Sequence, residues 1–281
     1  SKLLASESAH IEARTGEHEL HVFQALREMD ELFVANFMHF LDLVRAEHYD
    51  LWIGDEAWEL DHFLHEHPEL KTSPFAFLTD FVGYLPVDPS EAWLTADYNA
   101  ETIGHVERYP EVRDAAIFVG DEADLVPDSF GDGLPLIRDW VPKHFTFGGY
   151  VAPPVEREER ERPLIVGAVG GSGVGLPLLR RIAAAYALLD SGAELLLVCG
   201  PRIDPRQIEP VDGMTVVPYV HDLHRVLASC DLAVVQGGLS TTMELVAARR
   251  PFIYVPLRKH FEQNGHVAYR LQRYGALPPT P

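Results

Sequence analysis

Residues 232–256 read LAVVQGGLSTTMELVAARRPFIYVP and carry the clearest structural signal in the chain. The apolar run Leu232–Gln236 predicts a buried strand, and two glycines follow it directly. Thr241–Ala248 has the composition of a helix, and Phe252–Val255 predicts the next buried strand. Strands this apolar, joined by a helix, are typical of a parallel sheet that is covered by helices on both faces.

The same rhythm extends on both sides of this stretch. Further strands are predicted at Leu164–Val169, Glu194–Val198 and Met214–Val217, and further helices at 176–189, 221–229 and 261–274. Residues 163–281 therefore predict a doubly wound, Rossmann-like domain.

The N-terminal half shows a weaker alternation of the same kind. The expected strands are Tyr49–Asp55, Pro74–Asp80 and Ala115–Val119, and helices are expected over 17–45 and up to His65. The rest of 100–150 predicts long loops with one or two strands. The fold class is α/β with two Rossmann-like domains, an incomplete one at 1–150 and a second one at 163–281. A solvated linker at 151–162, which contains the charged run VEREERER, is expected between them.

Composition narrows the possible partners. The 281 residues carry a formal net charge of −20, which argues against nucleic acid and anionic membranes. Residues 1–150 hold nine basic and 30 acidic side chains, whereas the remainder is nearly neutral, so an anionic ligand would prefer the second domain. No apolar run is long enough for a transmembrane helix, and two cysteines in apolar surroundings point to a reducing, cytoplasmic location.

A glycine-rich turn, GAVGGSGVG at 167–175, follows the first strand of the second domain. Glycines allow a sharp turn and close approach of a ligand, and the helix that follows offers N–H groups to a phosphate. A dehydrogenase could show the same turn. However, Asp190, the acidic residue about twenty positions later, lies at a helix end and not at a strand end.

A second turn joins Gln236, Gly237 and Gly238 to a predicted helix that starts with Ser240 and Thr241. Hydroxyl side chains and backbone N–H groups at a helix start would bind a second anionic group. Glu244, one turn further, could accept hydrogen bonds from the vicinal hydroxyls of a ribose. The alternative is an ordinary capping box, with Ser240 or Thr241 as the N-cap and Glu244 as its partner.

A third polar group follows the strand Phe252–Val255. Glu262, Gln263 and Asn264 combine a carboxylate, which accepts hydrogen bonds, with amides, which both donate and accept, and this combination suits a sugar. Such a trio is also common at helix starts. Its position after the two phosphate-type turns, at a strand's carboxyl end, favours the sugar.

The stretch QGGLSTTMELVAARRPFIYVPLRKHFEQN resembles the donor-site signature of GT-B glycosyltransferases, both the UDP-glycosyltransferase type and the type that adds N-acetylglucosamine during lipid II synthesis. The resemblance implies inverting transfer of a sugar from a nucleoside-diphosphate donor, with UDP as the expected nucleotide, and no metal or other cofactor. The donor-binding residues it implies are Gly171, Ser172, Gly173, Tyr219, Val220, Gln236, Gly237, Gly238, Ser240, Thr241, Glu244, Glu262 and Gln263. The sequence departs from the family pattern at Gln236, where a histidine is usual, and at Arg249, where a glycine is usual.

Asp55 ends the strand Tyr49–Asp55, which is similar to a strand of natural-product glycosyltransferases whose acidic residue orients a catalytic histidine. The resemblance makes Asp55 an orienting residue, with a helix N-cap as the alternative. His62, His65 and His67 lie near Asp61, but the four do not share one helix face, so no metal site is predicted.

The expected partners are a nucleotide-sugar donor and a small-molecule or lipid-linked acceptor. The acidic, aromatic N-terminal half suggests an uncharged or cationic acceptor with apolar parts. A nucleotide-sugar epimerase and a non-catalytic nucleotide-sugar-binding subunit are the alternatives. Both chain ends look cut, since Ser1 leads straight into a helical pattern and Pro281 follows a helix abruptly.

Overall fold

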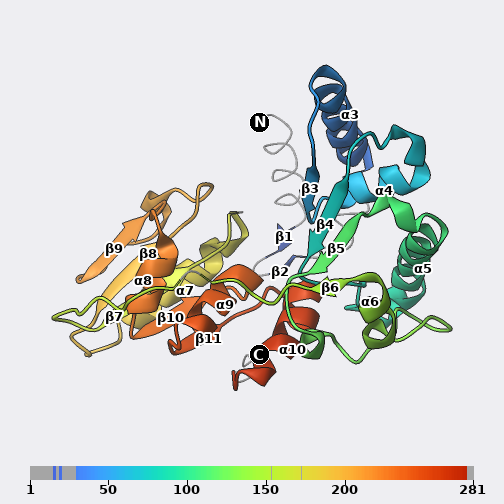
Figure 1. Cartoon of the computed structure of the whole chain (residues 1–281). Coiled ribbons are helices and arrows are strands. Elements are labelled where there is room, and N and C mark those ends of the chain that lie inside the picture. Colours follow the sequence, from blue (N-terminus) through green and yellow to red (C-terminus); the bar gives the residue numbers. More distant parts are fainter. Residues whose placement is uncertain (1–14, 17–18, 21–29, 153, 172, 277–281) are drawn as a thin grey trace. The chain divides into compact units, whose positions relative to one another are not determined.

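The chain folds into two compact units, each built on a parallel sheet (Figure 1). The computed structural model describes residues 15–16, 19–20, 30–152, 154–171 and 173–276. Of the described residues, the first unit contains 30–150, and the second contains those from Val151 onward together with 15–16 and 19–20. A short antiparallel pair, β1 (Thr15–Gly16) with β2 (Glu19–Leu20), precedes both sheets.

The first unit contains four parallel strands in the order β3-β4-β5-β6. The strands are β3 (Trp52–Asp55), β4 (Phe75–Thr79), β5 (Ala115–Phe118) and β6 (Thr146–Phe147). The helices between and around them are α3 (Asp30–Ala46), α4 (Trp58–Glu66), α5 (Ala92–Arg108) and α6 (Ile137–His144). The first unit therefore has a parallel α/β architecture, as the sequence predicts for both halves of the chain.

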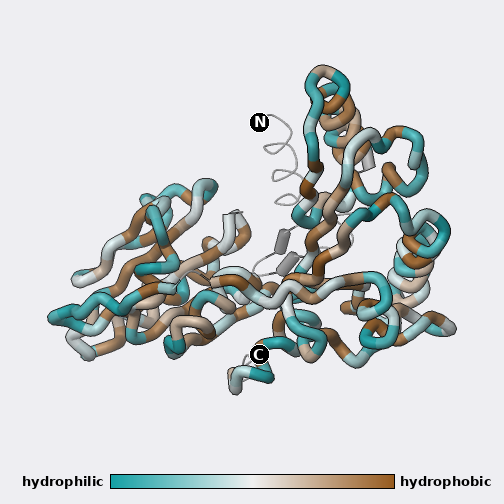
Figure 2. Tube along the Cα trace, in the orientation of Figure 1, coloured by the Kyte–Doolittle hydropathy of each residue, from teal (hydrophilic) through white to brown (hydrophobic). Residues whose placement is uncertain are grey.

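Aromatic side chains form much of the first unit's core. Trp52, Phe75, Phe77 and Phe81 are all buried, and the Trp58 ring packs edge-on against Phe77 with centroids 5.1 Å apart. Hydrophobic residues follow the strands in the hydropathy view (Figure 2). These four buried rings stabilise the sheet, so they give no support to the suggestion that the unit's aromatic content marks an acceptor surface.

The helix boundaries correct the sequence analysis at three places. The helix expected from residue 17 is wrong at its start, because Glu19–Leu20 pairs as a strand and α3 begins at Asp30. α5 and α6 were not anticipated. The buried face of α5 consists of Thr95, Asn99, Ile103 and Val106, and two polar residues among four hide the apolar period of the helix.

The second unit contains five parallel strands in the order β11-β10-β7-β8-β9. The strands are β7 (Leu164–Ala168), β8 (Glu194–Val198), β9 (Met214–Val217), β10 (Leu232–Val235) and β11 (Phe252–Tyr254). The α-helices are α7 (Leu176–Tyr186), α8 (Leu223–Ser229), α9 (Leu239–Ala247) and α10 (Ala268–Arg273). Every strand and helix predicted in this region is present, with ends that match or shift by at most three residues, except that the last predicted helix begins as a π-helix, Glu262–Val267.

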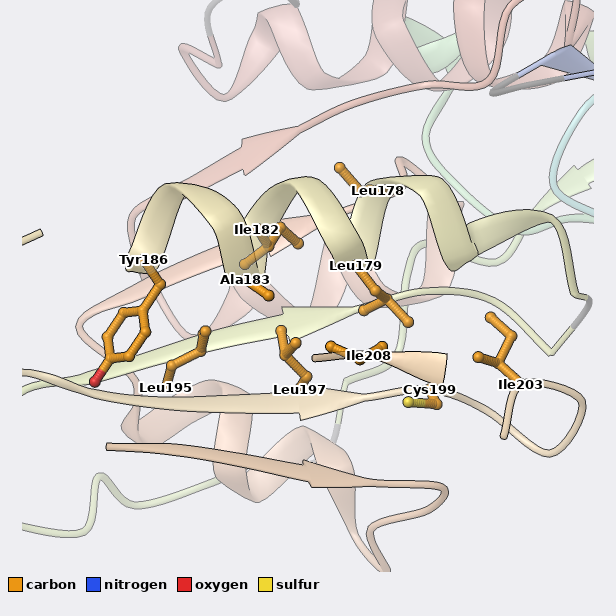
Figure 3. Packing of buried hydrophobic residues seen from close by; sticks show 10 residues of the cluster. All are labelled: Leu178, Leu179, Ile182, Ala183, Tyr186, Leu195, Leu197, Cys199, Ile203 and Ile208. Carbon is orange, nitrogen blue, oxygen red and sulfur yellow. The ribbon is translucent and has the colours of Figure 1, made fainter. Parts of the chain in front are cut away.

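The second unit's core lies where α7 covers β7 and β8 (Figure 3). Leu179, Ile182 and Ala183 of the helix pack against Leu195 and Leu197 of β8, and all five are buried. These helix positions repeat at three to four residues, and the strand positions at two, so each element presents one apolar face. Burying a side chain of this size contributes about 1.5–3 kcal/mol.

The described residues of the segment 151–162 form neither helix nor strand, and several of them contact the second unit. Arg157 forms an ion pair with Asp231 at 2.7 Å, and Arg160 forms one with Glu194 at 3.3 Å. The Glu158 backbone N–H donates to the Ser229 hydroxyl at 3.0 Å. The arginines of the charged run thus hold this segment against the second unit, while the glutamates remain exposed.

Of the helices that the structure describes, none combines the length and the apolar character needed to cross a lipid bilayer.

A buried polar cluster links α4 to β5 in the first unit. Asp61 accepts two hydrogen bonds from Arg113, and both side chains are almost completely buried. The His65 ring nitrogen Nδ1 donates to the Asp61 carbonyl at 2.7 Å, and its ring stacks on that of His105 with centroids 5.9 Å apart. Burial lowers the pKa of both His65 and His105, so the folded state keeps these imidazoles neutral.

This cluster predicts that the first unit loses stability as the pH falls below about 6.5. The unfolded chain binds protons at the ordinary histidine pKa of about 6.5, whereas the folded chain resists them, so protonation favours unfolding. All four tryptophans lie in this unit (Trp52, Trp58, Trp93, Trp140), so urea unfolding followed by tryptophan fluorescence between pH 8 and pH 5.5 measures the effect.

His65→Asn should reduce the pH dependence, because asparagine can still donate to the Asp61 carbonyl but does not titrate. His48→Asn is the matched control, since His48 is exposed. An unfolding midpoint that stays constant or rises on acidification would contradict the prediction.

Candidate functional site

The order of the second sheet places a reversal of winding direction, a topological switch point, between β7 and β10. The chain runs from β7 outward through β8 to β9, and then returns across the sheet to β10 on the other side of β7. Helices after β7 and β10 therefore leave in opposite directions, and ligands of open α/β sheets bind at this switch point. Val235 of β10 pairs with Ala168 of β7 and with Tyr254 of β11. The three strands therefore end at the same edge of the sheet, and the three predicted turns begin there.

The glycine-rich turn after β7 occupies one side of the switch point. It leads through a 3₁₀ turn, Gly173–Gly175, into α7. A Cβ atom built on Gly170 or Gly171 would have no atom within 4 Å, so the turn is open on the side where those side chains would lie. Gly171 and Gly173 follow the carboxyl end of β7, as the sequence predicts, whereas Ser172 lies outside the described residues.

The turn after β10 begins with a buried amide. Gln236 is 6% exposed, and its Nε2 atom has no hydrogen-bond partner among the described residues. Gly237 follows with a φ of +89°, in the left-handed region that favours glycine, and a Cβ there would lie 3.3 Å from the Tyr254 ring. The turn therefore depends on Gly237, and it leaves a buried donor unsatisfied, which costs about 1–3 kcal/mol.

Helix α9 starts directly after this turn without a side-chain cap. Its N-cap is Gly238, and no side chain accepts a hydrogen bond at the helix start. Ser240 and Thr241 are the second and third helical residues, so neither is an N-cap. This excludes the capping-box alternative, because that motif needs a side-chain acceptor at the N-cap position. The first backbone N–H groups of a helix have no intrahelical partner and attract negative charge.

Glu244 lies further along α9 and faces a cavity of about 290 Å³. Its carboxylate is half-buried, and burial raises its pKa, which the nearby His224 opposes. Among the described residues no hydrogen bond to this carboxylate is found. Such a group is available to accept hydrogen bonds from a ligand's hydroxyls.

Tyr219 and Val220 lie in the loop between β9 and α8. The Tyr219 ring is 70% exposed, which is unusual for a side chain of its size. The loop ends at Asp222, whose φ of +54° places it in the left-handed region before α8. Because α8 packs against α9, the loop leads toward the same helix pair that contains Glu244.

Glu262 and Gln263 lie on a π-helix, Glu262–Val267, that follows β11. The Leu257 N–H donates to Gln263 Oε1 at 2.9 Å, and Asn264 Nδ2 donates to the carbonyls of Leu257 and His260 at 2.7 and 2.8 Å. The side chains of Gln263 and Asn264 thus fix the loop between β11 and this helix. π-Helical turns are rare and are frequent at functional sites.

His260 belongs to the same loop, and the sequence analysis did not single it out. Burial lowers its pKa to about 4, so the ring is neutral at physiological pH. Its Nδ1 atom accepts a long hydrogen bond of 3.5 Å from the Gln263 N–H. His224 was missed as well, because a lone histidine in a short amphipathic helix gives no sequence signal.

Asp55 ends β3 in the first unit and is exposed. The N-cap of the helix that follows is Ala57, with no side-chain cap, so the N-cap alternative for Asp55 is wrong. No cluster of three or more His, Cys, Asp or Glu side chains suited to a metal ion occurs in the described part of the chain.

The sequence of the second unit matches a known domain. The match is to the glycosyltransferase family 28 C-terminal domain, over residues 165–276. The turn after β7, the turn after β10 and the π-helix all lie within it, so the resemblance predicted for 163–275 is confirmed.

Several glycosyltransferases are similar in sequence to part of this chain. An uncharacterized glycosyltransferase of Methanosarcina mazei is 31% identical over 115 residues, which are 41% of this chain and 30% of that protein. A zeaxanthin glucosyltransferase of Pseudescherichia vulneris is 34% identical over 145 residues, 49% of this chain and 34% of that protein. A lipid II-type N-acetylglucosamine transferase of Corynebacterium efficiens is 31% identical over 132 residues, which are 44% of this chain and 34% of that protein. The chain thus spans about a third of the length of these relatives.

Solved structures show the likeness of fold across both units. A calicheamicin glycosyltransferase gives a TM-score of 0.54 at 18% identity, covering 89% of this chain and 68% of its own. A spinosyn rhamnosyltransferase gives 0.56 at 18% identity, covering 89% and 64%. The predicted fold class, α/β of the GT-B type, is confirmed by these neighbours.

Gln236→Met should separate the effect of Gln236 on ligand binding from its effect on the stability of the second unit. Methionine has similar length and no polar group, so removing the unsatisfied amide should leave stability equal or raise it by about 1 kcal/mol. The same change should weaken diphosphate binding about tenfold or more, since a hydrogen bond to a charged group contributes roughly 1.5–3 kcal/mol. Calorimetric titration with UDP and thermal unfolding of the same preparation measure both.

Gln207→Met is the matched control, because Gln207 is exposed and lies in the connection between β8 and β9, not in a turn that follows β7 or β10. Unchanged UDP affinity in Gln236→Met would remove Gln236 from the site. A large loss of stability would show that its amide has a structural partner.

Proposed function

We propose that the protein transfers a hexose-type sugar from a nucleoside-diphosphate donor, with UDP as the nucleotide, to an acceptor hydroxyl with inversion at the anomeric carbon. The observation that carries the proposal is the buried, unpartnered amide of Gln236 beside the uncapped start of α9. A buried donor next to the backbone N–H groups of a helix start suits an anionic ligand such as a diphosphate.

The proposed roles follow the order of the turns along the sheet edge. The backbone at Gly171 and Gly173, with Ser172, approaches the diphosphate from the β7 side. Gln236, Gly237, Gly238, Ser240 and Thr241 bind it from the β10 side. Glu244 accepts hydrogen bonds from the ribose hydroxyls, and Tyr219 and Val220 flank the base.

Glu262 and Gln263 are proposed to contact the donor sugar. The Gln263 carbonyl is already used by the Leu257 N–H, which leaves its amide nitrogen as the group offered to a sugar hydroxyl. Fixing the loop and reading the sugar are compatible roles for one side chain.

Leaving-group stabilisation is the chemical contribution proposed for these residues. The departing diphosphate gains negative charge as the glycosidic bond breaks, and N–H groups already aimed at it stabilise that charge without reorganisation. A divalent cation is therefore not part of the proposed mechanism. Asp55 is proposed to orient the group that deprotonates the acceptor, which would bind to the first unit.

Calorimetric titration in EDTA tests the proposal. UDP, TDP and GDP are titrated separately into the protein, and at least UDP should bind with a dissociation constant below millimolar. Absence of binding by all three nucleotides at millimolar concentration would contradict the proposal.

Product analysis with a UDP-sugar separates transfer from the alternatives. Transfer requires an acceptor hydroxyl and releases UDP, whereas an epimerase converts the donor without an acceptor. Appearance of an epimerised donor in the absence of acceptor would contradict the assignment as a transferase.

A further inference from the structure

The glycine-rich turn after β7 lies against a glycine that follows the neighbouring strand β8. Val198 of β8 pairs with Ala168 of β7, and Gly200 comes two residues after Val198. A Cβ atom built on Gly200 would lie 2.8 Å from the Gly170 carbonyl oxygen and 3.7 Å from the Gly171 Cα atom. Any other amino acid at position 200 would therefore have to move one of the two backbones.

The backbone around Gly200 is fixed by the core of the second unit. The Cys199 N–H continues the ladder of β8 by donating to the Val217 carbonyl at 2.9 Å. Cys199 is fully buried, and Ile203, three residues after Gly200, is buried in the same cluster. Both side chains lie at the end of this cluster where α7 begins (Figure 3). Close packing around these two side chains opposes a shift of the chain between them.

The glycine-rich turn is the less constrained of the two backbones. Gly170 and Gly171 are exposed, and a Cβ built on either would have no atom within 4 Å. The far end of the turn is closed by Gly175, the N-cap of α7, where a Cβ would lie 2.4 Å from the Val169 Cβ. A side chain at position 200 would therefore displace the open middle of the turn and not β8.

The displacement is large on the scale of a hydrogen bond. A contact of 2.8 Å has to lengthen by about 0.6 Å to reach 3.4 Å, where ordinary van der Waals contact begins. Hydrogen bonds from backbone N–H groups need donor–acceptor distances of roughly 2.7–3.2 Å. A shift of this size therefore takes N–H groups of the turn out of reach of a phosphate that they would otherwise bind.

We propose that Gly200 is a positioning residue for the diphosphate of the donor and that it acts through the backbone of Gly170 and Gly171. This rests on the proposed function, since it concerns the diphosphate of the proposed donor. Gly200 acts by having no side chain, which lets the turn lie where its N–H groups meet the phosphates.

Binding of UDP, inorganic pyrophosphate and uridine by Gly200→Ala tests the proposal. UDP is titrated by calorimetry, and the other two are measured as competitors of UDP. The dissociation constants of UDP and pyrophosphate should rise about tenfold, because hydrogen bonds to the phosphates are lost. The dissociation constant of uridine, which has no phosphate, should stay within twofold of the wild-type value. A merely structural role would weaken all three ligands alike.

Gly192→Ala is the matched control. Gly192 precedes β8 and has a φ of +65°, close to the +77° of Gly200, but a Cβ there would have no atom within 4 Å. Its alanine variant introduces similar backbone strain without a contact to the turn. It should therefore lose thermal stability and keep the wild-type affinity for UDP.

Gly200→Asn separates the contact from the strain at the same position. Asparagine accepts a left-handed backbone more readily than alanine, but it still has a Cβ atom. This variant should lose less thermal stability than Gly200→Ala and show the same loss of UDP and pyrophosphate affinity.

The outcomes separate this inference from the proposed function. If the wild-type chain binds UDP and both variants at position 200 stay within twofold of it, the turn does not depend on Gly200, and the proposed function stands. An equal loss of all three ligands, or failure of both variants to fold, would also overturn the inference, because Gly200 would then serve the fold and not the turn. If the wild-type chain binds no nucleoside diphosphate, the proposed function itself fails, and the inference fails with it.

Discussion

The reversal of strand order between β7 and β10 is the constraint on which the second unit's function depends. Parallel strands need crossover connections, and the chain can place helices on both faces of a sheet only by winding outward from a central strand in two directions. The connections that follow the two strands flanking the reversal leave in opposite directions, and ligands of open α/β sheets bind at such a point. Every residue proposed to bind the diphosphate leaves the sheet at this edge.

The site is formed at a measurable energetic cost, and the core offsets it. Gln236 has a buried amide without a partner, Glu244 keeps a carboxylate whose pKa is raised by burial, and Gly237 requires a left-handed backbone. The buried Gln236 amide and the half-buried Glu244 carboxylate each oppose folding, and a ligand that forms hydrogen bonds to them would offset this cost. The buried contacts between α7 and β8 keep the sheet rigid enough to hold these groups in place.

Local patterns in the sequence predict the second unit well, because its strands are continuous apolar runs and its turns are rich in glycine. They predict the first unit less well. α5 buries Thr95 and Asn99 together with two apolar residues, so its period is hidden, and Asn99 instead bonds the backbone of Tyr84 and Phe130. Such long-range hydrogen bonds are invisible in a single sequence.

The same distinction applies to the candidate site. Glycine-rich turns and the pair Glu262 and Gln263 carry a chemical pattern that can be read in order along the chain. His224 and His260 do not, since their relevance comes from burial and from the packing of α8 on α9. The capping-box and N-cap alternatives could be excluded only after the helix starts had been located at Leu239 and Trp58.

The most direct test of the central claim is a crystal structure of the chain with bound UDP. The account predicts that the β-phosphate lies within hydrogen-bond distance of Gln236 Nε2 and of the first backbone N–H groups of α9. A nucleotide bound with its phosphates away from the carboxyl ends of β7 and β10, with Gln236 still buried and unpartnered, would contradict it.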